Sequence, residues 1–148
     1  MMNRINLIAL GVKDIAASLK FYREIGFEAS VRGPEEAPVI VFFKNQGTKL
    51  ELYPLELLAK DINEENPPAL STGGFPGITL AYNAKSEEEV DGIFHRVKEV
   101  EAEIAKAPKK TDWGGYSGYF RDPDGYYWEV AYGADWKFDE NDMLIIED

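Results

Sequence analysis

Residues 42–52 read FFKNQGTKLEL, and residues 120–130 read FRDPDGYYWEV. At a constant offset of 78 residues the two stretches share three residue types: Phe42 with Phe120, Gly47 with Gly125, and Glu51 with Glu129. Each stretch is typical of a β-hairpin, because apolar residues flank a short turn that contains Gly with Asn or Asp. The sequence therefore predicts two copies of one structural module.

The segments upstream of each hairpin repeat the same order of elements. Residues 5–12 are apolar and rich in β-formers, and a helix with the N-cap Asp14 follows them. In the second copy a strand at 77–82 precedes a helix whose capping box is Ser86 with Glu89. Further strands are predicted at 27–32, 39–44 and 49–53, and again at 103–106, 116–121 and 127–132. Each copy therefore has the order βαβββ.

The modules define the expected domain organisation. A chain of 148 residues suits one domain. Its parts are a first module at 1–62, which ends in a short helix at 55–60, a linker at 63–76 that is rich in Pro, Gly, Asn and Ser, a second module at 77–132, and an acidic C-terminal extension at 133–148. Met143-Leu144-Ile145-Ile146 is too apolar for a free tail, so we expect it to pack on another surface.

Composition excludes several classes of function. The chain has 27 Asp and Glu against 16 Lys and Arg, a net charge of −11, which disfavours binding to nucleic acid or to an anionic membrane surface. There is no cysteine, so disulfides, thiolate metal sites and cysteine nucleophiles are excluded. The one histidine, His95, falls on the solvent side of its helix. With no apolar span or signal peptide in the sequence, we expect a cytoplasmic protein.

Several motifs resemble one protein family. They are Phe21-Tyr22 with Gly26-Phe27, the run WGGYSGYF at 113–120, and DPDG at 122–125 followed by Trp128-Glu129-Val130. With the repeated module, they resemble the glyoxalase/bleomycin resistance/extradiol dioxygenase superfamily, also called vicinal oxygen chelate proteins, and within it the glyoxalase-like proteins of unassigned substrate. The resemblance implies an α+β fold in which two βαβββ modules form a cup-shaped, eight-stranded mixed sheet with helices outside. It also implies a ligand in the concavity and a homodimer.

The resemblance implies a metal site that this sequence lacks in part. Members of the superfamily bind one divalent metal through four inward strand positions, which correspond here to Leu7, Glu51, Gly77 and Glu129. Leucine and glycine have no donor side chain, so we expect no metal cofactor. That departure disfavours the chemistry of glyoxalase I and of the ring-cleaving dioxygenases.

Strand alternation selects the side chains that face the ligand. If Leu50 and Leu52 pack under a helix, then Lys49, Glu51 and Tyr53 face the opposite way, and the equivalent set is Tyr127, Glu129 and Ala131. On the first strands, Ile8 with Leu10 and Ile78 with Leu80 pack under the helices, while Leu7 with Ala9 and Gly77 with Thr79 face the ligand. Two carboxylates in one partly dry site repel each other, so one has a raised pKa. Glu51 and Glu129 are the candidate acid and base, and solvated strand glutamates are the alternative.

An aromatic cluster accompanies these glutamates. Its members are Trp113, Tyr116, Tyr119, Tyr126, Tyr127 and Trp128. With Tyr53 of the first hairpin they are the candidate wall for a flat ligand. Core and dimer packing is the alternative role for these rings.

Three functions remain open. The first is a metal-independent lyase or isomerase that uses Glu51 and Glu129 on a small organic molecule. The second is a non-catalytic protein that sequesters a drug or metabolite, as bleomycin resistance proteins do. The third is a metal enzyme whose incomplete ligand set is completed by substrate.

Overall fold

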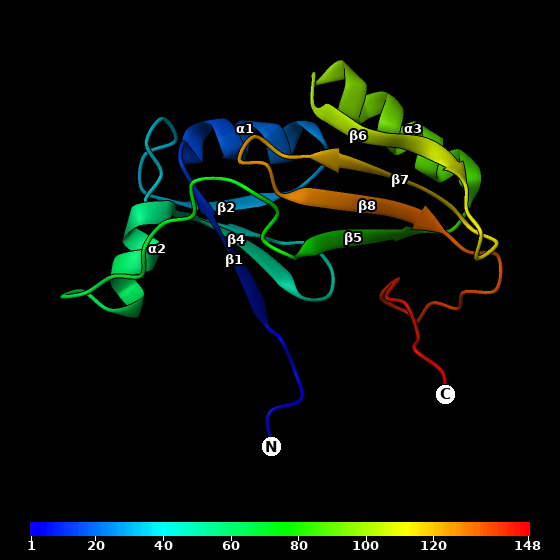
Figure 1. Ribbon diagram of the computed structural model, residues 1–148, viewed down its shortest axis with the longest axis horizontal. Coiled ribbons are helices and arrows are strands. Elements are labelled where there is room, and N and C mark those ends of the chain that lie inside the picture. The colour runs from blue at the N-terminus through cyan, green and yellow to red at the C-terminus, as the bar shows by residue number, and fades with distance from the viewer. The chain divides into compact units, whose positions relative to one another are not determined.

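The computed structural model describes all 148 residues, which divide into two compact units at 1–76 and 77–148. Each unit holds a four-stranded mixed sheet with a helix packed on one face (Figure 1). The prediction of an α+β fold with two βαβββ modules is confirmed. No helix has the length and apolar character needed to cross a membrane.

The first unit follows the predicted order. Its elements are β1 (Leu7–Val12), α1 (Ile15–Glu24), β2 (Ala29–Arg32), β3 (Ile40–Phe43), β4 (Lys49–Pro54) and α2 (Leu55–Ile62). The sheet order is β1-β4-β3-β2, with β1 parallel to β4 and the other pairs antiparallel. Asp14 caps α1 by accepting a hydrogen bond from the amide of Ala17 at 3.0 Å. Gly26, at φ 116°, follows the end of the helix, a conformation that favours glycine.

The core of the first unit lies between α1 and the sheet. Leu50 and Leu52 are buried there, as the alternation predicts. Tyr22 of α1 is fully buried, and its ring centroid lies 5.4 Å from those of Phe27 and Phe43. Glu51, the residue between Leu50 and Leu52 on β4, therefore points away from α1.

Helix α2 packs on the opposite face of the same sheet. Gly11 alternates with the buried Leu10 and Val12, so it faces away from α1. A Cβ atom at Gly11 would lie 2.6 Å from Cδ1 of Leu55, the first residue of α2. A glycine at this position thus allows α2 to pack close against the sheet face that carries Glu51.

The second unit repeats the order without a counterpart of α2. Its elements are β5 (Thr79–Ala84), α3 (Glu87–Glu99), β6 (Glu103–Lys110), β7 (Tyr116–Arg121) and β8 (Tyr127–Tyr132), with the sheet order β5-β8-β7-β6. Ser86 accepts from the amide of Glu89 at 3.0 Å, as the capping box predicts. The Glu89 carboxylate accepts instead from the amide of Lys85, at 2.8 Å. Strand β6 runs four residues past its predicted end, with register irregularities along its pairing with β7.

The core of the second unit lies between α3 and the sheet. Val90, Phe94 and Val97 of α3 are buried, which confirms these members of the predicted stripe. The Phe94 ring packs edge-on against Phe120, at 6.1 Å between centroids, and Phe120 stacks on Trp128 at 6.2 Å.

The first strand of the second module is displaced from its prediction by two residues. Gly77 has φ 84° and precedes β5, and Ile78 is exposed rather than under the helix. Leu7 pairs with Lys49, while the residue that pairs with Tyr127, the equivalent of Lys49, is Thr79. Thr79 is therefore the counterpart of Leu7, and the assignment of Gly77 to that position is wrong.

The connection between the two paired strands is one residue longer in the second hairpin than in the first. Phe42 pairs with Glu51, whereas the residue that pairs with Glu129 is Tyr119. The predicted match of Phe42 with Phe120 is therefore wrong. The counterpart of Phe42 is Tyr119, and that of the buried Phe43 is the buried Phe120. The longer turn is held by the buried carboxylate of Asp122, which accepts from the amides of Asp124 and Tyr126 at 2.9 Å each.

The C-terminal extension folds back on itself. Leu144 forms a β-bridge with Phe138, and the amide of Ile145 donates to the carbonyl of Lys137 at 2.8 Å. Leu144 is half-buried, but Met143, Ile145 and Ile146 are exposed. The expected packing is thus seen for Leu144 only.

Candidate functional site

Glu129 lies at the centre of the sheet face that α3 does not cover. Its register neighbours are Ala81 on β5 and Tyr119 on β7. The Tyr119 hydroxyl donates a hydrogen bond to Oε2 of Glu129 at 3.1 Å. Burial, together with the Glu129 charge and this hydrogen bond, raises the pKa of Tyr119, so the hydroxyl stays protonated at neutral pH. Tyr119 therefore holds one carboxylate oxygen, a role that alternation alone did not assign to it.

Cationic groups flank this pair. The ammonium of Lys106 lies 5.8 Å from the centre of the Tyr119 ring, and the guanidinium of Arg121 lies 5.1 Å from that of Tyr127. Arg121 also pairs with Glu103 at 3.1 Å. The face thus offers the Glu129 carboxylate and two tyrosine rings that bind cations, and the hydroxyl of one of these rings, Tyr119, donates to the carboxylate.

Glu51 occupies the equivalent position in the first unit. Its register neighbours are Ala9 on β1 and Phe42 on β3, and its side chain is half-buried. Burial raises the pKa of Glu51, and the negative charge of Asp61 raises it further. Asp61 belongs to α2, beyond the predicted helix end at residue 60. The sequence reasoning did not find this residue, although the direct passage of β4 into α2 is the signal that the helix returns over the sheet.

The predicted ligand-binding residues separate into those that share a glutamate face and those that do not. In the first unit Leu7 and Tyr53 lie on the Glu51 face, with Leu7 exposed and Tyr53 half-buried. In the second unit Thr79 and Tyr127 share the Glu129 face. Gly77 lies before β5 and is on neither strand face.

Tyr116 and Trp113 have other surroundings. Tyr116 alternates onto the α3 side of the sheet, where its hydroxyl donates to Oδ1 of Asp91 at 2.6 Å. That hydrogen bond is the main cause that raises the pKa of Tyr116 to about 12. The prediction that Tyr116 joins the ligand face is therefore wrong.

Trp113 stacks on Trp136 of the C-terminal extension, at 5.5 Å between centroids and 14° between planes. A Cβ at Gly115 would lie 1.9 Å from Cη2 of Trp113, so the glycine provides the space for this ring. The ring packs with the C-terminal extension. His95 is exposed on α3, as predicted.

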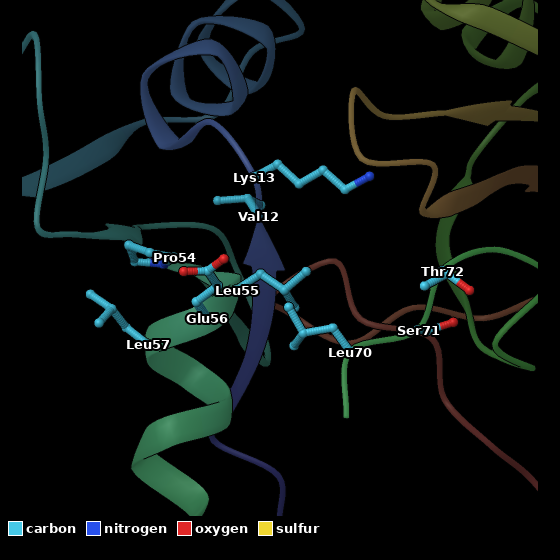
Figure 2. A pocket seen from close by; sticks show the side chains of 9 residues that line it. All are labelled: Val12, Lys13, Pro54, Leu55, Glu56, Leu57, Leu70, Ser71 and Thr72. Carbon is cyan, nitrogen blue, oxygen red and sulfur yellow. The ribbon is translucent and has the colours of Figure 1, made fainter. Parts of the chain in front are cut away.

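A cavity lies within the first unit, where β1 and β4 end and α2 begins (Figure 2). Its volume is about 580 Å³, and its lining consists of Val12, Lys13, Pro54, Leu55, Glu56, Leu57, Leu70, Ser71 and Thr72. None of the predicted site residues lines it. The sequence pattern assigns these residues to a strand end, a helix start and a linker, and no local signal shows that these segments meet.

Metal donors are sparse in both units. The four strand positions that the resemblance singles out hold Leu7 and Glu51 in the first unit and Thr79 and Glu129 in the second. In neither unit do three His, Asp or Glu side chains gather closely enough to hold a metal ion.

The sequence matches a known family over most of its length. Residues 4–130 match the model of the Glyoxalase/Bleomycin resistance protein/Dioxygenase superfamily. A curated relative, metallothiol transferase FosB from Shouchella clausii, is 30% identical over 136 residues, which cover 90% of this chain and 83% of the relative.

Solved structures extend the comparison. A glyoxalase-related enzyme from Fulvimarina pelagi has a TM-score of 0.84 and 26% identity, covering 99% of this chain and 100% of its own. A lactoylglutathione lyase from Agrobacterium tumefaciens has a TM-score of 0.69 and 27% identity, covering 94% of this chain and 100% of its own.

Proposed function

This chain belongs to the glyoxalase/bleomycin resistance protein/dioxygenase superfamily, and from that membership we propose that it binds a small organic molecule and moves a proton on it. The proposed activity is that of a lyase or isomerase, with Glu51 as the acid and Glu129 as the base. The observation that carries the proposal is the hydrogen bond from Tyr119 to Glu129 at 3.1 Å on a sheet face that also holds Tyr127. A base needs a fixed oxygen beside a surface that can hold a substrate.

Glu129 suits the role of base because its two oxygens differ in their surroundings. Oε2 accepts from Tyr119, whose raised pKa keeps the phenol a donor. The second oxygen, Oε1, is then the one that would accept a proton from a carbon or hydroxyl of the substrate. The Tyr119 hydroxyl fixes the carboxylate plane during that transfer.

Glu51 suits the role of acid because burial and Asp61 both raise its pKa. A raised pKa enlarges the protonated fraction near neutral pH, and a protonated carboxyl can donate to a developing oxyanion. Tyr53 and Leu7 share its sheet face and offer apolar contacts for the substrate.

We further propose that this chemistry needs no resident metal. Neither unit offers a donor set that fits a divalent ion. In the first unit Leu7 beside Glu51 has no donor, and in the second the hydroxyl of Thr79 beside Glu129 is a weak one. The name of the curated relative, metallothiol transferase, points to a metal, so measuring the metal content of this chain tests the proposal directly. Protein purified without chelator should carry far less than one Mn, Zn, Fe or Ni per chain. Added Mn²⁺ should leave the melting temperature unchanged, since a ligand of the native state would raise it.

A second candidate function is sequestration of a cationic drug or metabolite. The observation that favours it is that Tyr119 and Tyr127 each already lie under a cation, Lys106 and Arg121, beside the Glu129 carboxylate. A cationic ligand could replace either side chain on its ring. Under this function the chain binds its ligand but leaves it chemically unchanged.

One experiment separates the two functions. The chain is screened against small ketones, hydroxy acids and cationic aromatics, with product formation and binding measured in parallel. Under the proton-transfer function, Glu129→Gln lowers turnover by a factor of about 100 and weakens binding much less. Glu88→Gln, an exposed change on α3, is the matched control. Binding without turnover in the parent, weakened in Glu129→Gln, supports sequestration. Equal turnover and binding in the parent and both variants contradicts both functions.

We also propose a homodimer, as the family resemblance implies. The exposed Ile145 and Ile146 are apolar surface available for such a contact. Light scattering at micromolar concentration should give twice the chain mass, and a monomer mass would contradict the proposal.

A further inference from the structure

We propose that the cavity in the first unit binds an amphipathic monocarboxylate, with its acid group at Lys13 and its apolar body against Leu55 and Leu70. We call this space the α2 cavity, after the helix whose first turn forms one wall. Its volume of about 580 Å³ lies within the range of roughly 300 to 1,000 Å³ that is usual for small-molecule sites. The proposal is separate from the proton-transfer chemistry assigned to the glutamates.

The apolar part of the cavity comes from two segments of the first unit. Figure 2 shows the side chains of Leu55, on α2, and Leu70, on the segment that follows it, pointing into the same space. Leu70 is 39% exposed and Leu57, also in the lining, is 45% exposed. Leucines left this exposed around a concave space gain most from an apolar ligand, because the ligand removes their surface from water.

The polar part of the cavity lies around Lys13. In Figure 2 its side chain extends on the side of the cavity where Ser71 and Thr72 lie. An ammonium group has three N–H donors, so Lys13 can bind a carboxylate while it keeps another partner. The Thr72 hydroxyl can donate as well, whereas the Ser71 hydroxyl donates to the carbonyl of Gly73 at 3.1 Å. A cation and a hydroxyl beside leucine side chains select an acid that has an apolar body.

Glu56 limits the charge of the ligand. Its carboxylate lies in the first turn of α2 and lines the same cavity. A second negative charge on the ligand would meet this carboxylate, and the chain as a whole carries −11. The geometry therefore favours one acid group over two.

Octanoate, octanamide and suberate test these requirements, since they have the same chain length and differ in charge. Calorimetric titration of the full chain should show saturable binding of one octanoate per chain. Octanamide should bind at least about tenfold more weakly, because it loses a charged hydrogen bond. Suberate should also bind at least about tenfold more weakly, because its second carboxylate adds a repelled charge. Methyl resonances of Leu55 and Leu70 should shift on addition of octanoate.

Variants of the chain test whether the acid group of the ligand binds at Lys13. Lys13→Met keeps length and apolar stem but removes the charge, and it should weaken octanoate binding by about tenfold. Lys20→Met removes an exposed charge from α1 that pairs with Glu24 at 3.6 Å, and it should leave binding unchanged. Leu70→Ser, at an exposed position, should weaken binding with folding retained. Absence of saturable binding, equal binding of octanamide, or equal binding by Lys13→Met and Lys20→Met would each overturn the proposal.

Discussion

Glu51 and Glu129 occupy the same register position in the two units, yet their surroundings differ. Each has an alanine on one side, Ala9 or Ala81. On the other side Glu51 has Phe42, and Glu129 has Tyr119, whose hydroxyl donates to it. Only the first unit has α2, which brings the charge of Asp61 near Glu51.

A single oxygen atom and one added helix thus give two copies of a carboxylate different environments. A hydrogen bond fixes Glu129, whereas burial and a like charge raise the pKa of Glu51. Duplication of a module therefore does not imply duplication of a chemical role. The tests below either remove this difference or measure it.

The prediction with the largest expected effect tests whether Phe43 and Phe120 occupy equivalent positions in the two units. Phe43 and Phe120 are both 2% exposed and are counterparts by register. Replacing either by Ala should lower the free energy of unfolding by about 3–5 kcal/mol through the cavity left behind. Phe42→Ala, at a half-buried position, should cost less than half as much. Denaturant unfolding measures all three. If Phe42→Ala lowers the free energy of unfolding as much as Phe43→Ala does, the result would favour the constant offset of 78, which makes Phe42 the counterpart of Phe120.

Tyr119→Phe makes the second unit resemble the first. The variant keeps the ring and loses the hydroxyl that holds Glu129, so the free energy of unfolding should fall by about 1 kcal/mol. If Tyr119 positions the base, the pH profile of turnover should also move, because the partner of Glu129 is gone. Tyr132→Phe, on the sheet face opposite Glu129 at the end of β8, is the control for loss of a phenol. A pH profile identical to that of the parent would show that Tyr119 has no positioning role.

Glu51→Gln tests the environment of the first glutamate through stability. Because burial and Asp61 raise the folded pKa of Glu51 above its ordinary 4.5, the carboxyl favours folding below that value. This advantage is lost as pH rises through the folded pKa. The Gln variant should therefore gain on the parent as pH increases from 4 to 7, by under about 1 kcal/mol for a solvent-screened group. Unfolding curves at several pH values measure the difference, and a gain that shrinks with pH contradicts the assignment.

Phe42→Tyr makes the converse change and should have the smallest effect. It adds a hydroxyl at the position from which Tyr119 reaches Glu129 in the second unit. A donor to the charged form lowers a carboxyl pKa, so the pKa of Glu51 should fall toward its ordinary value. Carbon-detected NMR titration of the Glu51 carboxyl reads this directly. An unchanged or higher pKa would show that the two hairpins do not present their rings alike.

Sequence alone predicted what depends on local periodicity. Alternation placed Leu50 and Leu52 in the core and Glu51 opposite them, because a strand has a fixed period of two. The same rule placed Glu129. The caps at Asp14 and Ser86 were also local signals, carried by side chains next to the helices they begin.

Sequence alone failed where the answer depends on contacts between distant segments. The pairing of Thr79 with Tyr127 fixes the start of β5, and a period of two cannot distinguish Gly77 from Thr79 because both have the same parity. The partner of Tyr116 is Asp91, which lies 25 positions earlier on α3. Asp61 and the α2 cavity both depend on where α2 packs, which the close approach at Gly11 determines.

The stacked indoles of Trp113 and Trp136 give the protein an optical signal of its own. Rings 5.5 Å apart are close enough for their electronic transitions to interact, so we expect the stack to make a circular dichroism contribution that separated indoles lack. The third tryptophan, Trp128, is buried against Phe120 in the second unit's core. Detachment of residues 133–148 should therefore remove that contribution while Trp128 stays packed against Phe120. Partial opening of the C-terminal extension can in this way be followed without any label, and told apart from global unfolding.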